Sequence, residues 1–141
     1  MKELYRVTKK NGLVFVVFMP RMKHILQSLM YPENWLPHNS VNAIQRFSET
    51  GCFDHADKGR FTSAFFYRVE EIEPFMQANG FEKVALLSSN IGSMLTKQQW
   101  DYWIEKGEKE MERVVELMTE NAADSSLLGI SSHLLYIGKK R

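Results

Sequence analysis

One apolar segment near the N-terminus constrains the fold more than any other part of the sequence. Leu13 to Met19 is a continuous run of apolar residues, most of them β-branched or aromatic, and Pro20 ends it. An uninterrupted run of this kind is typical of a strand buried on both faces, as in sheets with helices on each side. The segment is too short to cross a bilayer as a helix. It therefore predicts an α/β fold built around a buried strand.

Helix and strand patterns alternate along the rest of the chain. The capping box from Thr96 to Gln99 opens a long helix that Gly107 weakens or kinks. Further helices are predicted at 2–8, 21–30, 40–49 and 69–79, the third of them behind a Ser40 cap. Together with two more β-forming runs, these patterns predict an α/β domain whose small mixed sheet has strands at about 12–19, 81–88 and 132–138.

Composition narrows the classes of function. The 141 residues suit one domain, and 18 Lys+Arg against 17 Asp+Glu give a net charge of +1. The chain therefore lacks the strong positive field that favours nucleic-acid binding. A single Cys excludes an intramolecular disulfide, and Met1 opens directly into a charged stretch rather than a signal sequence. We expect a cytoplasmic protein with neither a nucleic-acid nor a membrane partner.

Two passages follow the pattern of a known family. Residues 3–14 read ELYRVTKKNGLV, and residues 61–81 combine an F-rich start, the triplet EEI and a closing Gly-Phe. They resemble the E-x-x-R-V-L-K-P-G-G turn and the next helix of class I S-adenosylmethionine-dependent methyltransferases. Lys10 and Asn11 stand where that family usually has Pro and Gly, and Asn tolerates the positive φ of such a turn. The chain thus resembles the C-terminal half of this Rossmann-like fold.

The resemblance implies that residues 1–141 form a single incomplete domain without the N-terminal cofactor-binding strands. In the family, a Gly-rich turn after the first strand and an acidic residue ending the second hold S-adenosylmethionine. This sequence has no G-x-G cluster, so we expect no cofactor-binding residue and no metal site in it. The complete transferase would methylate a small-molecule acceptor, whereas the truncated chain is expected to be inactive and to bind the cofactor poorly.

The resemblance also implies that strand 132–138 lies antiparallel between the other two. Leu13–Phe18 then lies at an edge of the sheet, and it has no charge and no internal Pro to prevent pairing. We expect either the missing N-terminal half or a second copy, giving a dimer, to pair with this strand. The alternative from another class is a non-enzymatic interaction module, or truncated product, that associates through the same edge.

Residues 21–67 are predicted to form a lid or insert on the substrate side. Aromatic side chains with polar tips suit a small-molecule pocket, and an arginine after the strand could hold an anionic group bidentately. For each aromatic residue, packing in the core or lid is the more common role, and an arginine at position 21 is equally often a solvated surface residue. No catalytic residue is assigned, although His24 and His38 are candidate general bases. The candidate substrate-binding residues are Arg21, His24, Trp35, His38 and Tyr67.

Two other features favour a structural interpretation. Cys52 and His55 are spaced like a pair of metal ligands or a nucleophilic pair, but the possible further ligands His24 and His38 lie at no recognisable spacing from them. The apolar stripe from Trp100 to Met118 could form an interface with a partner helix. Packing of this stripe on the sheet is the favoured interpretation.

Overall fold

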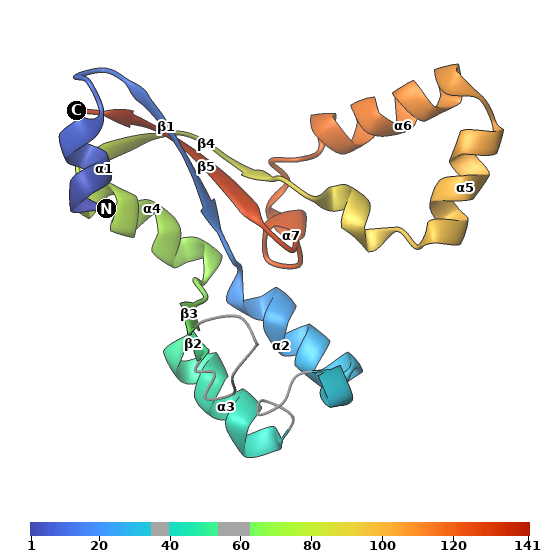
Figure 1. Cartoon of the computed structure of the whole chain (residues 1–141), viewed down its shortest axis with the longest axis horizontal. Helices are drawn as coiled ribbons and strands as arrows, with labels where there is room; N and C mark the ends of the chain where they lie inside the picture. Colours follow the sequence, from blue (N-terminus) through green and yellow to red (C-terminus); the bar gives the residue numbers. More distant parts are fainter. Residues whose placement is uncertain (35–39, 54–62) are drawn as a thin grey trace.

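The computed structural model describes residues 1–34, 40–53 and 63–141. Its centre is a three-stranded sheet in the order β1 (Leu13–Phe18), β5 (Leu134–Lys140) and β4 (Phe81–Ser88) (Figure 1). The strand positions and their order agree with the predictions. The prediction of a mixed sheet is wrong, because β5 pairs antiparallel with both neighbours. β1 and β4 therefore run in the same direction, and each has an edge without a partner strand in the described part of the chain.

Helices cover one face of this sheet. The core joins Val14, Phe18, Leu134 and Tyr136 to side chains of α4 (Val69–Ala78) and α7 (Ser125–Leu128). Met1 and Leu4 bring α1 (Lys2–Val7) to the same cluster. The face is apolar because alternate residues of each strand point toward it.

The prediction that β1 is buried on both faces is wrong. Leu13, Phe15 and Val17 are 54%, 64% and 58% exposed, whereas Val14 and Phe18 are buried. The ladder places Phe15 beside Ile137 and Ala85, and Val17 beside Leu135 and Leu87. We call these six residues the open face: Phe15, Val17, Ala85, Leu87, Leu135 and Ile137. The continuous apolar run thus reflects two apolar faces, of which this chain covers one.

The turn between α1 and β1 is fastened to the end of β5. Asn11 has φ +62°, as the predicted turn requires, and its N–H donates to the carbonyl of Lys140 at 3.1 Å. The Lys140 ammonium donates to the carbonyls of Tyr5 and Thr8 at 2.6 and 2.8 Å. These carbonyls lie at the C-terminal end of α1, where a cation is favourable.

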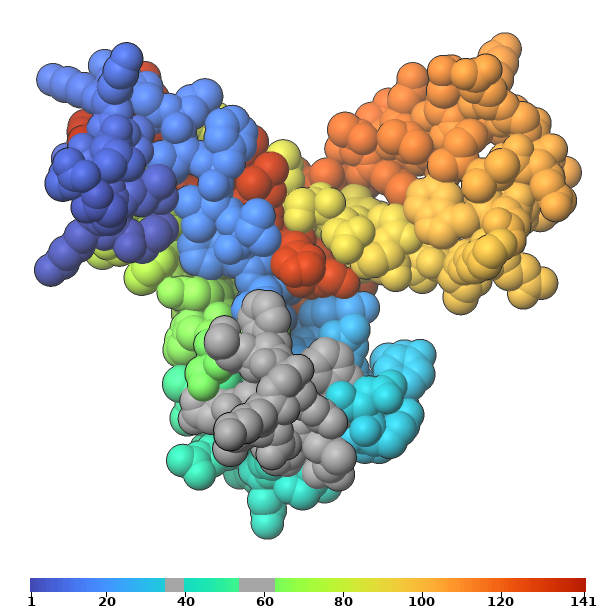
Figure 2. Space-filling view, in the orientation of Figure 1, coloured from blue at the N-terminus to red at the C-terminus, as the bar shows by residue number. Residues whose placement is uncertain are grey.

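An insert follows β1 and leads into α4. It contains α2 (Arg21–Met30), η1 (Pro32–Asn34), α3 (Val41–Thr50) and the short hairpin of β2 (Cys52–Phe53) and β3 (Ala64–Phe65). Ser40 caps α3 as predicted, since its hydroxyl accepts from the N–H of Ala43 at 3.2 Å. The hairpin was not predicted. The insert projects from the sheet as a separate lobe (Figure 2).

A helical arm joins β4 to α7. It consists of η2 (Ile91–Met94), α5 (Lys97–Glu105) and α6 (Glu108–Glu120), and it extends away from the sheet (Figures 1 and 2). The capping box at Thr96 is confirmed. Gly107 breaks the expected long helix in two rather than kinking it, because its φ of +101° is incompatible with a continuous helix. Among the described residues, no helix is long and apolar enough to cross a membrane.

Candidate functional site at the carboxyl end of β1

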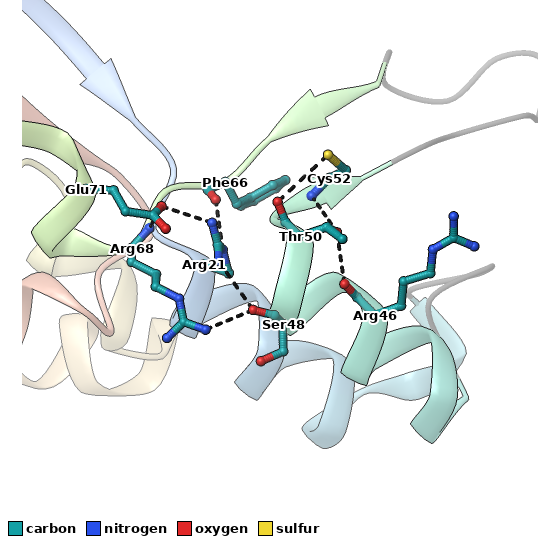
Figure 3. Close-up of polar contacts among 8 residues, drawn as sticks. All are labelled: Arg21, Arg46, Ser48, Thr50, Cys52, Phe66, Arg68 and Glu71. Carbon is teal, nitrogen blue, oxygen red and sulfur yellow. Dashed lines mark hydrogen bonds and ion pairs between the residues drawn. The ribbon is translucent and has the colours of Figure 1, made fainter. Parts of the chain in front are cut away.

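Arg21 joins three segments at the point where β1 ends. Its side chain is almost fully buried, and the residue is 3% exposed. The guanidinium donates from Nε to the carbonyl of Phe66 at 3.1 Å, from Nη1 to that of Ser48 at 3.3 Å, and from Nη2 to the Glu71 carboxylate at 2.9 Å (Figure 3). Arg21 therefore joins α2 to α3, to the end of β3 and to α4. We call the point where these segments meet the junction.

The surrounding backbone is shaped to fit this guanidinium. Gly51 ends α3 with φ +71°, and a Cβ built on it would lie 2.5 Å from both Arg21 Nη2 and the carbonyl oxygen of Phe66. Only glycine combines this conformation with such a close approach. Arg68 completes the junction: its side chain donates to the Ser48 carbonyl at 3.0 Å, and its N–H donates to Glu71 at 2.9 Å.

A pocket of about 250 Å³ opens beside this junction. Arg21 and Tyr67, two of the predicted substrate-binding residues, both line it. Burial, and then the nearby charge of Glu71, raise the pKa of the Tyr67 phenol. A tyrosine phenol is protonated at neutral pH, and the raised pKa only strengthens this, so Tyr67 can act here as a hydrogen-bond donor. The other lining residues are Pro20, Met22, Ile25, Ser48, Arg68, Val69, Glu70 and Gly129.

His24 lies one turn along α2 in a different environment. It is 2% exposed, and its ring centre lies 4.6 Å from that of Phe47, 4.8 Å from Phe53 and 4.7 Å from Phe66. This cluster is the small core of the insert and does not line the pocket. Trp35, His38 and His55 lie outside the described residues. Of the three predicted residues that the structure describes, Arg21 and Tyr67 come together at the pocket and His24 does not.

Sequence reasoning missed Arg68 and Ser48. The Arg68 guanidinium is exposed and lines the pocket, while Ser48 contributes its backbone carbonyl to the junction. A backbone acceptor leaves no signal in residue identity. Arg68 could have been noticed because it lies two residues before the Glu70-Glu71-Ile72 triplet, although nothing in that position alone distinguishes a pocket arginine from a surface one.

The free edge of β1 is the second notable feature. Lys140 donates its N–H to the carbonyl of Gly12 at 2.9 Å, so Gly12 faces β5 in the ladder. Bonded and non-bonded positions alternate along an antiparallel pair, so Val14, Val16 and Phe18 also face β5. The N–H and C=O groups of Leu13, Phe15 and Val17 must therefore point away from the sheet.

The apolar stripe of the arm does not pack on the sheet, contrary to the favoured interpretation. Trp103, Val114, Leu117 and Met118 line a groove of about 450 Å³ together with residues of η2 and α7. Trp100 instead fixes the start of the arm, because its indole N–H donates to the carbonyl of Gly92 at 3.0 Å. None of the residues of α6 is fully buried.

Apart from the junction, the described residues offer few candidates for catalysis or metal binding. Cys52 is exposed, and its Sγ lies 3.8 Å from the carbonyl oxygen of Thr50. In the described part of the chain, no three His, Cys, Asp or Glu side chains gather as metal ligands would. The site therefore consists of the junction, its pocket and the adjoining strand edge.

Comparison with known proteins assigns no family and no function to this chain. No protein-family model matches this sequence. A search of curated proteins finds no significant match.

Proposed function

We propose that this chain is the acceptor-side half of a class I S-adenosylmethionine-dependent methyltransferase that acts on a small molecule. One observation carries the proposal: β5 lies antiparallel between β1 and β4, which run in the same direction. This is the arrangement that the resemblance implies for the three closing strands of the family. The positive φ of Asn11 at the turn between α1 and β1 supports the same alignment.

The pocket beside Arg21 supplies the proposed acceptor site. It lies at the carboxyl end of β1, where α/β sheets bind their ligands. Tyr67 offers a protonated hydroxyl and Arg68 an exposed guanidinium, so the pocket suits an acceptor with a polar or anionic group. Arg21 holds the walls in place through its buried contacts. Methyl transfer from a sulfonium depends mainly on alignment of the acceptor, which is the contribution a rigid pocket makes.

The described residues do not suit the cofactor by themselves. β1 ends at Phe18 and is followed by Met19 and Pro20, and β4 ends at Ser88 and is followed by Ser89 and Asn90, so neither strand leads into a Gly-rich turn. Neither β1 nor β4 ends in an acidic residue that could bind a ribose. We therefore assign cofactor binding to the completing half, and we assign no catalytic step to this chain alone.

The experiment compares the chain alone with the chain completed by its upstream sequence. Calorimetry of the 141-residue chain with S-adenosylmethionine should show no micromolar binding. Co-expression with the polypeptide encoded directly upstream of Met1 should give a complex that binds the cofactor and methylates an acceptor. Micromolar binding by the chain alone would contradict the proposal. So would a stable complex without cofactor binding, which would favour the interaction module.

The interaction module is the second candidate, and the β1 edge is the observation that favours it. An unpaired apolar edge serves any partner that adds a strand, whether or not the product is an enzyme. The two candidates share the same surface and differ only in whether the assembled complex has activity.

A further inference from the structure

The pocket beside the junction carries two charges that no described residue neutralises. Arg68 and Glu70 both line this pocket. Within the described ranges, no carboxylate lies at ion-pair distance from the Arg68 guanidinium, and no cationic group lies at that distance from Glu70. Arg21 differs, because its guanidinium lies 2.9 Å from the Glu71 carboxylate. The pocket therefore offers a ligand one unmatched positive charge and one unmatched negative charge.

The positions of these two residues on α4 explain why they do not neutralise each other. Arg68 is the N-cap residue of the helix, and Glu70 is its second residue. Side chains two residues apart on a helix do not face each other. The Arg68 guanidinium turns toward α3, where Nη2 donates to the Ser48 carbonyl at 3.0 Å (Figure 3). This contact holds the side chain in place and leaves the other N–H groups of the guanidinium for a ligand.

The pocket also offers an apolar wall and room beside it. Met22 and Ile25 of α2 and Val69 of α4 contribute apolar side chains. Gly129 lines the pocket as well, and a Cβ built on it would have no other atom within 4 Å. The volume of about 250 Å³ is several times the roughly 30 Å³ that one water molecule occupies in the liquid. Small-molecule sites typically combine such an apolar lining with a few charged or polar groups.

We infer that this pocket binds a small zwitterion, an amino acid with an aliphatic side chain. The carboxylate of the ligand accepts hydrogen bonds from Arg68, and its ammonium group donates to Glu70. Its side chain lies against Met22, Ile25 and Val69. A simple anion would leave Glu70 unpaired beside it and a simple cation would leave Arg68 unpaired, whereas a zwitterion matches both charges. The inference rests on the proposed function, because it names the class of acceptor.

An NMR titration of the 141-residue chain tests this inference with three probes. L-Leucine carries both charges, 4-methylpentanoate lacks the ammonium group, and 3-methylbutylamine lacks the carboxylate. L-Leucine should shift the backbone signals of residues 67–70 and should bind at least about fivefold more tightly than either analogue, because each analogue leaves one charge of the pocket unpaired. Absence of binding at millimolar leucine, shifts confined to other residues, or equal affinity for an analogue would overturn the inference.

Two charge variants assign each end of the ligand to one residue. Arg68→Met should abolish the preference for leucine over 3-methylbutylamine and keep the preference over 4-methylpentanoate. Glu70→Gln should have the opposite pattern, so each variant serves as the control for the other. Both side chains are exposed, so neither change should prevent folding. Identical patterns in the two variants, or unchanged preferences in both, would contradict the assignment.

Gly129 provides a test that leaves the charges untouched. Its backbone angles, φ −69° and ψ −26°, are ordinary for a helix, so another residue can adopt them. Gly129→Leu should lower the affinity for leucine at least about tenfold, because the new side chain occupies the open space of the pocket. Ser126→Leu adds the same side chain at an exposed position of α7 that does not line the pocket, and it should leave the affinity unchanged. Undiminished binding by Gly129→Leu would show that leucine binds elsewhere.

The two proposals can fail separately, because binding of the probes to the free chain needs no cofactor. If the chain binds leucine with the expected preferences and the completed complex methylates nothing, the zwitterion site is correct and the methyltransferase proposal is wrong. If the completed complex is an active methyltransferase but the pocket does not distinguish leucine from its analogues, the enzyme proposal stands and the zwitterion site is wrong.

Discussion

The two outer strands of the sheet differ in how well their free edges are protected against pairing with another strand. β4 carries the charged residues Glu82 and Lys83 near its start, and its register shifts between Lys83 and Ala85. Lys83 also forms an ion pair with Glu73 of α4. Charges and bulges are the devices by which natural sheets prevent edge-to-edge pairing. β1 has neither: its six residues are all apolar, and its register with β5 is unbroken.

An open edge is therefore not simply a by-product of a small sheet. The same chain protects one edge and leaves the other open, so the β1 edge is a specific feature of the sequence. The two faces differ in the same way, because α4 covers one and no described residue buries Phe15 on the other.

The largest effect is expected from the covered face. Met76 of α4 is fully buried against the sheet, so Met76→Ala should lower the free energy of unfolding of the free chain by about 2–5 kcal/mol. Phe15→Ala, on the open face, should cost less than about 1 kcal/mol, since that side chain is already mostly exposed. Urea unfolding measures both values. Similar losses for the two variants would show that the open face is covered in the free chain.

Arg21 should produce the next largest effect. Arg21→Met removes three hydrogen bonds to the Phe66 carbonyl, the Ser48 carbonyl and Glu71, and should cost about 2–3 kcal/mol. Arg68→Met is the matched control at the same junction, and it should cost less than about 1 kcal/mol because its guanidinium is exposed. If Arg21→Met unfolds no more easily than Arg68→Met, the junction does not hold the insert in place.

Sequence reasoning predicted the features that depend on neighbouring residues, and it missed those that depend on residues far away along the chain. The cap at Ser40, the capping box at Thr96 and the turn at Asn11 are set by neighbours a few residues away, and each was predicted. The strand order followed from the family resemblance. Local patterns could not show that Gly107 would divide the long helix into α5 and α6, nor that β1 would keep one face open.

The candidate site was predicted only in part for the same reason. Arg21 and Tyr67 were expected near a pocket, and both line one. The partners of Arg21 lie 27, 45 and 50 residues away along the chain, so no local pattern could reveal that its guanidinium is occupied. The contact of Arg21 with a substrate stays a prediction, whereas its hydrogen bonds to Phe66, Ser48 and Glu71 are present in the structure.

The two outer strands can be compared directly by adding one charge to each. In the free chain, Val17→Lys should raise the concentration at which light scattering reveals association by roughly two- to threefold, because it protects the exposed edge. Val84→Lys should change it little, since β4 is already protected. An equal gain from both variants would mean that association depends on net charge and not on the edge of β1.

The smallest effect is expected on β5, between the two outer strands. Tyr136 is fully buried, and its hydroxyl has no hydrogen-bond partner among the described residues. Tyr136→Phe removes this unsatisfied group and should change the free energy of unfolding by about 0–1 kcal/mol, in the stabilising direction. Burial, and then the charge of Glu73, also raise the pKa of the phenol.

The raised pKa of Tyr136 gives the same variant a pH signature. The stability that goes with the neutral phenol is fully present below the ordinary tyrosine pKa of about 10. It is lost as pH rises from there through the higher folded-state pKa, since the unfolded chain releases the proton first. Urea unfolding between pH 8 and pH 11 should therefore show a shallower alkaline loss for Tyr136→Phe than for the natural chain. An unchanged slope would mean that the phenol reaches water without unfolding, and that the central strand is less well covered than its burial indicates.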